Sequence, residues 1–251
     1  MSRLIAVTGK GGVGKTTVSA LIIKALIESG NGPVLAIDAD PNACLDAALG
    51  VTAADTVGRA REEVREAVTS GAAANLSKQE LLRMKIERAL TEADGFDLIA
   101  MGRPEGAGCY CYANNVLKEI IVSMTGRYRA VVLDNEAGLE NLSRRIVQKV
   151  DRMVLVSDAS NAGLNTLLRL HGLAAEMGMQ YQKLAIVINR LRAGSLPDRA
   201  KAIKSQTGAD WLIGLPDNGE IMAFAEGNES LLNLPGGNPV YQTIRDWIVN
   251  G

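Results

Sequence analysis

The fold is decided by residues 9–17, which read Gly9-Lys10-Gly11-Gly12-Val13-Gly14-Lys15-Thr16-Thr17. The apolar run Leu4–Val7 precedes this stretch, and the apolar positions of Val18–Glu28 follow it with helical periodicity. A glycine-rich loop between a strand and a helix turns successive backbone N–H groups toward phosphate oxygens, and the helix N-terminus adds a positive dipole end. The sequence therefore predicts a phosphate-binding loop of the kind found in nucleotide hydrolases.

The spacing within this loop gives individual side chains a chemical role. Lys15 is expected to reach the β- and γ-phosphates of a nucleotide, and Thr16 to place its hydroxyl on Mg²⁺. We expect the nucleotide to be bound by the following residues of the loop: Gly9, Gly11, Gly12, Val13, Gly14, Lys15, Thr16 and Thr17.

Short apolar runs rich in valine, isoleucine and leucine recur along the chain. They are Leu4–Val7, Val34–Ile37, Leu98–Met101, Ala130–Leu133, Met153–Val156, Leu184–Ile188 and Trp211–Leu215. Continuous apolar runs are typical of strands buried on both faces. Helical patterns separate most of them, as in Val18–Glu28, Leu142–Val150 and Leu164–Met177. This alternation predicts an α/β fold with a doubly wound, mostly parallel sheet and helices on both faces.

One stretch, residues 53–93, interrupts this alternation. It has no strand pattern, and charged residues crowd its part from Arg59 to Glu66. We expect a mostly helical insertion with a solvated face. A cap that covers one edge of the sheet is favoured over a lid or an element that docks a partner, because charge runs usually face solvent.

Composition limits the remaining classes. The chain has 251 residues and is expected to form one domain over residues 1–251. Its net charge of −1 provides no field to attract nucleic acid or an anionic membrane, and we expect neither as a partner. We find no signal-peptide pattern and no apolar stretch near the ~18 residues of a membrane span. Three cysteines without a disulfide-like framework favour a cytoplasmic protein.

A second lysine, Lys10, distinguishes the phosphate-binding loop. With it, the string resembles the deviant Walker A signature of the MinD, ParA and nitrogenase iron protein class of P-loop ATPases. The resemblance implies that Lys10 reaches across a dimer to the partner's nucleotide, as an arginine finger does when it speeds hydrolysis by roughly 10³–10⁵. It thus implies a homodimer that hydrolyses ATP, with Lys10, Lys15 and Asp40 as catalytic residues.

Carboxylates follow two of the predicted strands, in Asp38-Ala39-Asp40-Pro41 and in Asp134-Asn135-Glu136-Ala137-Gly138. Ligands of open α/β sheets lie at the carboxyl ends of the strands. In the resembled class, the aspartate at the position of Asp40 orients the attacking water, and we expect Asp38 to lie near Mg²⁺. Asp134 corresponds to a Walker B carboxylate, and Gly138 to a hinge near the γ-phosphate.

The base site is expected where two later strands end. Asn189 corresponds to the position whose side-chain amide contacts adenine in this class, and Pro216 and Asp217 to the turn on the other side of the base. No Asn-Lys-x-Asp string for guanine is present there, so ATP is favoured.

A pair of cysteines, Cys109 and Cys111, lies between a predicted strand and an apolar helical pattern. The nearby helix N-terminus favours thiolates, and an extended backbone puts both side chains on one face. Two thiolates do not complete a four-coordinate site, but two copies across a dimer would supply four sulfurs. Such a set suits Zn²⁺ or an iron–sulfur cluster when it is tetrahedral, and Ni²⁺ or Cu²⁺ only if it can flatten. Two buried, inert cysteines are the alternative.

The phosphate-binding loop, the Asp38–Pro41 string with Cys44 after it, and Gly108–Tyr112 together resemble the CooC family, including its relative AcsF. The family implies a dimeric ATPase that carries nickel on paired cysteines and delivers it to carbon monoxide dehydrogenase or acetyl-CoA synthase. Ni²⁺ is then the metal at Cys109 and Cys111, with Zn²⁺ possible there. For Cys44, a buried apolar role is favoured over that of a transient metal ligand.

Two other functions stay open at this point. A reductase similar to nitrogenase iron protein would hold a [4Fe–4S] cluster between subunits, but no cysteine follows Asp134. A spatial organiser similar to MinD or ParA would need a basic surface or a basic amphipathic C-terminal helix. Residues 240–251 contain one arginine, Arg245, next to Asp246, and they favour a helix packed on the core.

Overall fold

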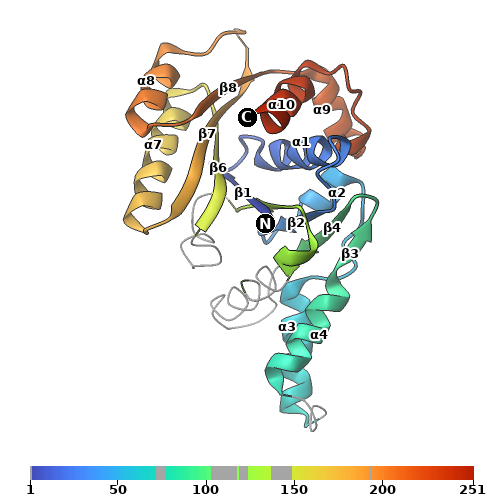
Figure 1. The fold of residues 1–251 in the computed structure, drawn as a ribbon. Helices are drawn as coiled ribbons and strands as arrows, with labels where there is room; N and C mark the ends of the chain where they lie inside the picture. Colours follow the sequence, from blue (N-terminus) through green and yellow to red (C-terminus); the bar gives the residue numbers. More distant parts are fainter. Residues whose placement is uncertain (1, 72–76, 103–117, 119–123, 137–148, 193) are drawn as a thin grey trace.

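The structure of this protein is a computed structural model, and it describes residues 2–71, 77–102, 118, 124–136, 149–192 and 194–251 (Figure 1). These residues form an eight-stranded sheet in the order β3-β4-β2-β5-β1-β6-β7-β8. The strands are β1 (Arg3–Gly9), β2 (Val34–Asp38), β3 (Thr91–Ala93), β4 (Phe96–Ala100), β5 (Ala130–Asp134), β6 (Lys149–Asp158), β7 (Gln180–Leu191) and β8 (Trp211–Pro216). Every pairing is parallel except that of β3 with β4. The predicted fold class is confirmed.

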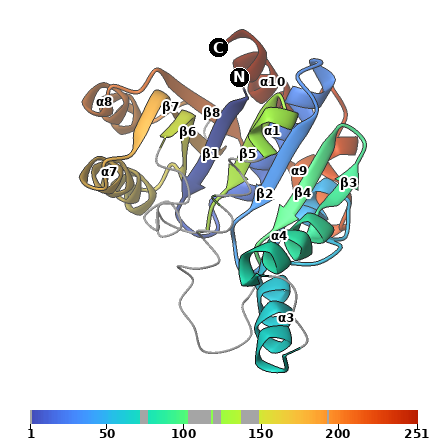
Figure 2. The same ribbon diagram turned by 60° about the horizontal axis from the view of Figure 1, so that its bottom comes forward.

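Helices cover both faces of the sheet (Figure 2). One face carries α1 (Lys15–Glu28), α2 (Leu45–Leu49), α9 (Gly219–Glu226), the short turn η2 (Leu231–Asn233) and α10 (Pro239–Asn250). The other carries α3 (Val57–Thr69), α4 (Lys78–Ala89), α7 (Asn161–Glu176) and α8 (Asp198–Thr207). A turn of 3₁₀ helix, η1 (Thr125–Arg127), precedes β5.

The central strand β1 shows why the apolar runs are continuous. Ile5 and Val7 belong to the core on the α1 side, and Ala6 belongs to the core on the opposite side. All three are fully buried, because strand side chains alternate between faces and both faces are covered. The strand therefore lacks the alternating pattern of apolar and polar residues that a strand with one exposed face would have.

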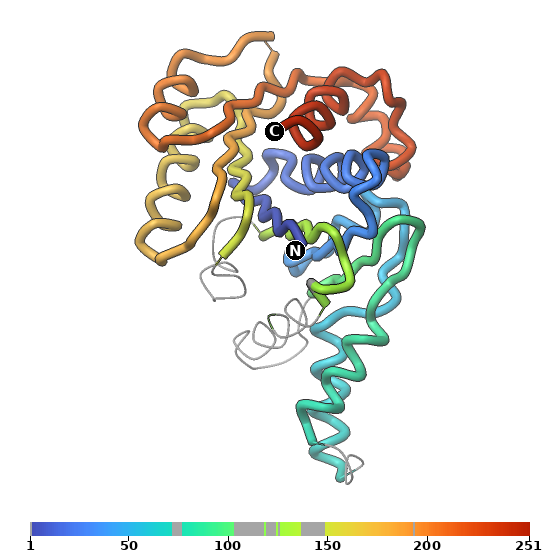
Figure 3. The backbone as a smooth tube through the Cα atoms, viewed as in Figure 1, coloured from blue at the N-terminus to red at the C-terminus, as the bar shows by residue number. Residues whose placement is uncertain are grey.

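Helices α3 and α4 lie side by side and extend away from the sheet, as Figures 1 and 3 show. Each begins at a capping side chain: the Thr56 hydroxyl accepts the Arg59 N–H, and Ser77 forms a capping box with Glu80. Val57, with other apolar residues of the two helices, joins the core beneath the sheet. This apolar base holds the pair of helices on the body, together with a 2.9 Å bond from the Gly58 N–H to the carbonyl oxygen of Met101.

Two local predictions differ from the structure. Thr91–Ala93 form the strand β3 inside the segment where no strand was expected; three residues that pair antiparallel with the edge strand β4 are too short a run to show a pattern. The helix expected over 142–150 lies outside the described residues except for Lys149 and Val150, which begin β6. No helix within the described ranges combines the length and the apolar character that a membrane span requires.

Candidate functional site

The sheet brings the predicted carboxylates together at one edge. Asp38 at the end of β2 is the register partner of Asp134 at the end of β5, and β5 also pairs with β1, which ends at Gly9. The first strand, β1, lies in the middle of the sheet between β5 and β6. Earlier strands follow on one side of it and later strands on the other, so the strand order reverses at β1. Ligands bind where strand order reverses in this way, at the carboxyl ends. The phosphate-binding loop thus lies directly beside both aspartates.

Two glycines of the loop are required by close approach. A Cβ on Gly9 would lie 2.2 Å from the carbonyl oxygen of Val156, and one on Gly14 would lie 2.4 Å from Nδ2 of Asn189. Gly14 also has a φ of 91°, in the left-handed region that disfavours side chains. Because no side chain fits at either position, these two glycines let the loop pack directly against the ends of β6 and β7.

Both lysines of the loop are now placed. Lys15, the first residue of α1, is buried, and its Nζ donates to the carbonyl oxygen of Lys10 at 3.4 Å. The side chain of Lys10 is exposed. One lysine therefore lies inside the site of its own chain, and the other faces outward.

A hydrogen-bond network surrounds Asp134. Its Oδ2 accepts from the Thr16 hydroxyl at 2.7 Å, and its Oδ1 accepts from the Ser19 hydroxyl at 3.0 Å. Burial raises the pKa of Asp134 to about 6, although both hydroxyls and the Lys15 cation act in the opposite direction. A buried carboxylate and a hydroxyl beside a phosphate-binding loop are the oxygen donors that fit Mg²⁺. Ser19 was not predicted; its signal is a polar residue one helical turn after Thr16 in an apolar helix.

Asp38 holds the loop that follows β2. Its Oδ1 accepts the N–H of Asp40 at 3.0 Å, and its Oδ2 accepts the N–H of Leu45 at 2.8 Å. Burial raises its pKa to about 7, and the negative charge of Asp134 adds to the increase. Its observed partners are therefore backbone donors, and the carboxylate fixes both ends of the segment that carries Asp40.

Asp40 is half-buried in that segment. Its Oδ1 accepts from the backbone N–H and from the side-chain amide of Asn42, both at 2.9 Å. Cys44 follows and is exposed, so the expectation of a buried apolar role for it is wrong. The turn around Ala43, whose φ is 46°, keeps the thiol outside the core. Partial burial and neighbouring carboxylates, Asp38 first, raise the pKa of the Cys44 thiol.

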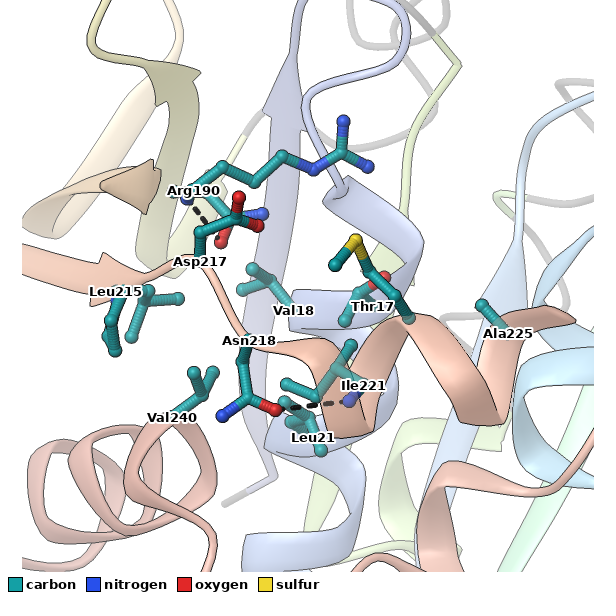
Figure 4. A pocket seen from close by; sticks show the side chains of 13 residues that line it. Thr17, Val18, Leu21, Arg190, Leu215, Asp217, Asn218, Ile221, Ala225 and Val240 are labelled. Atoms are coloured by element: carbon teal, nitrogen blue, oxygen red, sulfur yellow. Dashed lines mark hydrogen bonds between the residues drawn. The ribbon is translucent and has the colours of Figure 1, made fainter. Parts of the chain in front are cut away.

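A pocket opens beside the loop, between the ends of β7 and β8 and the helices α1 and α9 (Figure 4). It encloses about 510 Å³ with its open mouth included. Its lining comprises Thr17, Val18, Leu21, Asn189, Arg190, Leu215, Pro216, Asp217, Asn218, Ile221, Met222, Ala225 and Val240. All three residues predicted to surround the base therefore line one pocket.

Asn189 also has a partner that the sequence did not indicate. Its Nδ2 donates to the carbonyl oxygen of Val13 at 2.9 Å, and its Oδ1 accepts the N–H of Arg190 at 2.9 Å. On the facing turn, the N–H of Asp217 donates to the carbonyl oxygen of Leu191 at 3.2 Å. The strand ends are thereby joined to the loop and to each other.

A second hollow lies on the other side of the loop, where Gly12 and Val13 face Asp158 and Ser160. Asp158 at the end of β6 accepts the Ser160 N–H at 2.9 Å and also binds the Ser160 hydroxyl. The bond to Ser160 lowers the pKa of Asp158, and the Lys10 cation contributes to the decrease. Asp158 is a strand-end carboxylate that was not predicted, because β6 ends two residues beyond the apolar run Met153–Val156.

Three predicted residues, Gly138, Cys109 and Cys111, lie outside the described residues. Within the described ranges, no group of three histidine, cysteine, aspartate or glutamate side chains is arranged to hold a metal ion.

Known proteins resemble this chain along nearly its full length. An uncharacterized ATP-binding protein of Methanocaldococcus jannaschii is 41% identical over 247 residues, which are 97% of this chain and 96% of that protein. The carbon monoxide dehydrogenase accessory protein CooC of Rhodospirillum rubrum is 30% identical over 250 residues, covering 92% of this chain and 89% of CooC.

The fold also matches solved structures. A ParA family ATPase from Chlorobium tepidum superimposes with a TM-score of 0.72 at 19% identity, over 98% of this chain and 97% of that one. The CobQ/CobB/MinD/ParA nucleotide binding domain matches residues 4–231. With the loop, the buried carboxylates and the pocket at one edge of the sheet, this match shows that the chain belongs to the CobQ/CobB/MinD/ParA family of P-loop nucleotide-binding proteins.

Proposed function

We propose that this protein is an ATPase that binds ATP with Mg²⁺ at the loop of residues 9–17 and hydrolyses it as a homodimer. The observation that carries the proposal is the bond from the Thr16 hydroxyl to the buried Asp134 carboxylate, 2.7 Å long and next to the N-terminus of α1. A buried carboxylate with a raised pKa at this position is stabilised by a cation, and a nucleotide brings one with it.

Each group of the chain then has a task. The backbone N–H groups of the loop and the cation of Lys15 hold the phosphates, and Thr16 with Asp134 holds Mg²⁺, which neutralises charge on the phosphate oxygens when bound. Asp40 orients the attacking water, and Asp38 positions Asp40 through the backbone bond at 3.0 Å. The pocket of Asn189, Pro216 and Asp217 takes the adenine base.

The position of Lys10 is the reason that we propose a homodimer. Its side chain is exposed beside its own loop, whereas Lys15 is buried there. An exposed cation at this edge supports a role on a nucleotide that is held by a second, facing copy. It would act on charge that develops in the transition state, which raises turnover more than affinity.

Separate assays of binding and turnover test this function. Lys10→Ala is expected to retain ATP affinity and to lose most hydrolysis, and Lys15→Ala to lose both. Lys201→Ala, which removes an exposed lysine of α8, is the matched control and should behave as the wild-type protein does. Equal losses of affinity and turnover in Lys10→Ala would contradict a role for Lys10 across the dimer.

The finer proposal is that this cytoplasmic, single-domain ATPase is a nickel chaperone that carries Ni²⁺ on Cys109 and Cys111 of both subunits. The identity of 30% with a carbon monoxide dehydrogenase accessory protein over 92% of the chain favours it. The Cys-x-Cys pair favours it too, since two copies supply four sulfurs. Its client would be a nickel enzyme, carbon monoxide dehydrogenase or acetyl-CoA synthase, and Zn²⁺ would compete for the same sulfurs.

Metal analysis coupled to size-exclusion chromatography, with and without ATP, tests the chaperone function. We expect about one Ni²⁺ per dimer, lost when Cys109 and Cys111 both become serine while ATP binding persists. Cys44→Ser is the control, because it removes an exposed thiol elsewhere. Unchanged metal content in the double variant would exclude the cysteine pair, and ATP-dependent co-sedimentation with DNA or liposomes would indicate a spatial organiser instead.

A further inference from the structure

Arg190, immediately after Asn189 at the end of β7, has an unusual backbone. Its φ is 56°, in the left-handed region, and the pairing of β7 with β8 shifts register between Ile188 and Leu191. This region suits glycine, and a branched or long side chain is strained in it. Strained backbone of this kind clusters at ligand-binding sites, so the surroundings of the Arg190 side chain bear on its role.

The backbone around Arg190 is fixed from both sides. The Arg190 N–H donates to Oδ1 of Asn189 at 2.9 Å, and the same amide group donates to Val13. The next carbonyl, that of Leu191, accepts the Asp217 N–H at 3.2 Å. The strained conformation is thus held by both walls of the base pocket, so the direction in which the Arg190 side chain leaves the strand is determined.

The side chain itself is exposed. The bond to Ser160 lowers the pKa of Asp158, and the charge of Arg190 adds to this decrease. Among the described residues, none forms a hydrogen bond or ion pair with the Arg190 guanidinium. Arg190 lines the base pocket together with Thr17 and Pro216, and it also lines the hollow beside Gly12. Figure 4 shows it extending from the strand end across the top of the base pocket, on the side of the loop between β1 and α1.

Apolar side chains make up part of the lining of the same pocket. Val18, Pro216 and Ile221 offer apolar surface, which suits the face of a flat ring. A guanidinium is also planar, and it stacks on aromatic rings through both dispersion and its charge. One side of the pocket is therefore complementary to one face of a base, and the cation above is complementary to the other.

We propose that the guanidinium of Arg190 stacks on the purine base of the bound nucleotide and closes the pocket over it. This inference rests on the proposed function, since it concerns the same nucleotide site. It assigns to Arg190 the selection of the base, while the loop of residues 9–17 binds the phosphates. A direct contact from Arg190 to the phosphates is the competing arrangement. Stacking on the base would affect only ligands that carry a base, whereas a phosphate contact would also affect the affinity for a polyphosphate without one.

Calorimetric titration with ADP and with tripolyphosphate, which has no base, separates the two arrangements. Arg190→Gly removes the side chain and relieves the backbone strain, so the variant is expected to fold with an unchanged or higher Tm. Its affinity for ADP should fall by roughly 3- to 30-fold, the range of a cation–π contact, while its affinity for tripolyphosphate stays the same. Arg190→Lys keeps the positive charge but lacks the planar guanidinium group. Its ADP affinity should therefore fall by most of the amount expected for Arg190→Gly.

Arg192→Gly is the matched control, because Arg192 is exposed two residues later and lines the hollow beside the loop, whereas the lining of the base pocket does not include it. It should bind both ligands as the wild-type protein does. Equal losses for ADP and tripolyphosphate in Arg190→Gly, or no loss for either, overturn stacking and leave the proposed function intact. A wild-type protein that binds neither ligand overturns both proposals.

Discussion

The side-chain amide of Asn189 donates a hydrogen bond of 2.9 Å to the carbonyl oxygen of Val13, 176 residues earlier in the chain. Val13 is buried in the phosphate-binding loop, so this bond fixes the loop against the end of β7. Resemblance to known ATPases implied that Asn189 contacts adenine. The structure gives one of its amide hydrogens to the loop and its oxygen to Arg190, which leaves one N–H for a base.

Asn189→Ala is therefore expected to weaken the phosphate site as well as the base site. The carbonyl of Val13 would lose its partner, which costs about 1–3 kcal/mol for a buried group. We expect a lower Tm and a reduced affinity for both ADP and tripolyphosphate, measured by thermal unfolding and calorimetry. Asn161→Ala, in which an exposed side chain on α7 loses its bond from Arg199, is the control and should change neither. A loss confined to ADP would show that Asn189 serves the base alone.

The stability of the nucleotide-free protein should depend on the ionisation of Asp134. Its pKa of about 6 lies above the ordinary value of 3.8, so the folded protein holds the proton more tightly than the unfolded chain. Asp134 therefore stabilises the fold below about pH 4, and this contribution, up to roughly 3 kcal/mol, is lost as pH rises through 6. Asp134→Asn removes the buried charge, and the Thr16 and Ser19 hydroxyls can reorient toward an amide.

Thermal unfolding of both proteins between pH 5 and pH 8 measures this effect. The Tm of Asp134→Asn relative to the wild-type protein should rise with pH. Adding ATP and Mg²⁺ should raise the Tm of the wild-type protein more than that of the variant, because the wild-type protein binds them more tightly. A Tm difference that is constant with pH would contradict the ionisation of Asp134 as its source.

Mixing two inactive variants tests whether Lys10 acts across the dimer. In a mixed dimer of Lys10→Ala with Asp40→Ala, the Lys10→Ala subunit keeps its own Asp40 and receives Lys10 from its partner. One of its two sites is then complete, and random mixing should restore up to roughly a quarter of the wild-type hydrolysis rate. The rate is measured after the variants exchange subunits. No recovery, in a mixture shown to contain mixed dimers, would place the action of Lys10 within its own subunit.

Lys24, a buried lysine of α1, should matter more for stability than an exposed lysine. Lys24 Nζ donates to Glu28 at 2.6 Å and to the carbonyl oxygen of Leu232 at 2.5 Å, and its side chain is only 6% exposed. Lys24→Met leaves that carbonyl without its donor and is expected to lower the free energy of unfolding by about 1–3 kcal/mol. Denaturant unfolding of the variant and of the wild-type protein measures this change in free energy.

Lys201→Met on α8 is the control for Lys24→Met. The partner of Lys201, Asp198, is 98% exposed, so the free energy of unfolding should change little, as is usual for surface ion pairs. Similar losses in the two variants would mean that the bonds of Lys24 contribute no more than a surface ion pair.

Several features of this protein could be predicted because their causes are local. A glycine that must accept a positive φ, as at Gly14, and apolar runs buried on both faces leave a signal within a few neighbouring residues. The same applies to the strand-end position of Asp38 and Asp134. The strand β3 left no such signal, since its existence depends on the edge of β4.

The contacts of the site belong to the tertiary structure. Asn189 and Val13 meet only because β7 and β1 lie on either side of β6, and Asp158 reaches the second hollow for the same reason. Exposure of Cys44 depends on how Asp38 holds the loop around it, which no property of a cysteine in the sequence reveals.

The sequence by itself determined the doubly wound sheet, the phosphate-binding loop and the strands whose ends surround it, because propensity and periodicity act over short stretches of chain. Only the tertiary structure decided which side chains share a hydrogen bond and which carboxylates are buried side by side. It also decided that Arg190 has a positive φ and lines the base pocket. Burial, pKa and contact depend on atoms brought from distant parts of the chain, and those distances exist only after folding.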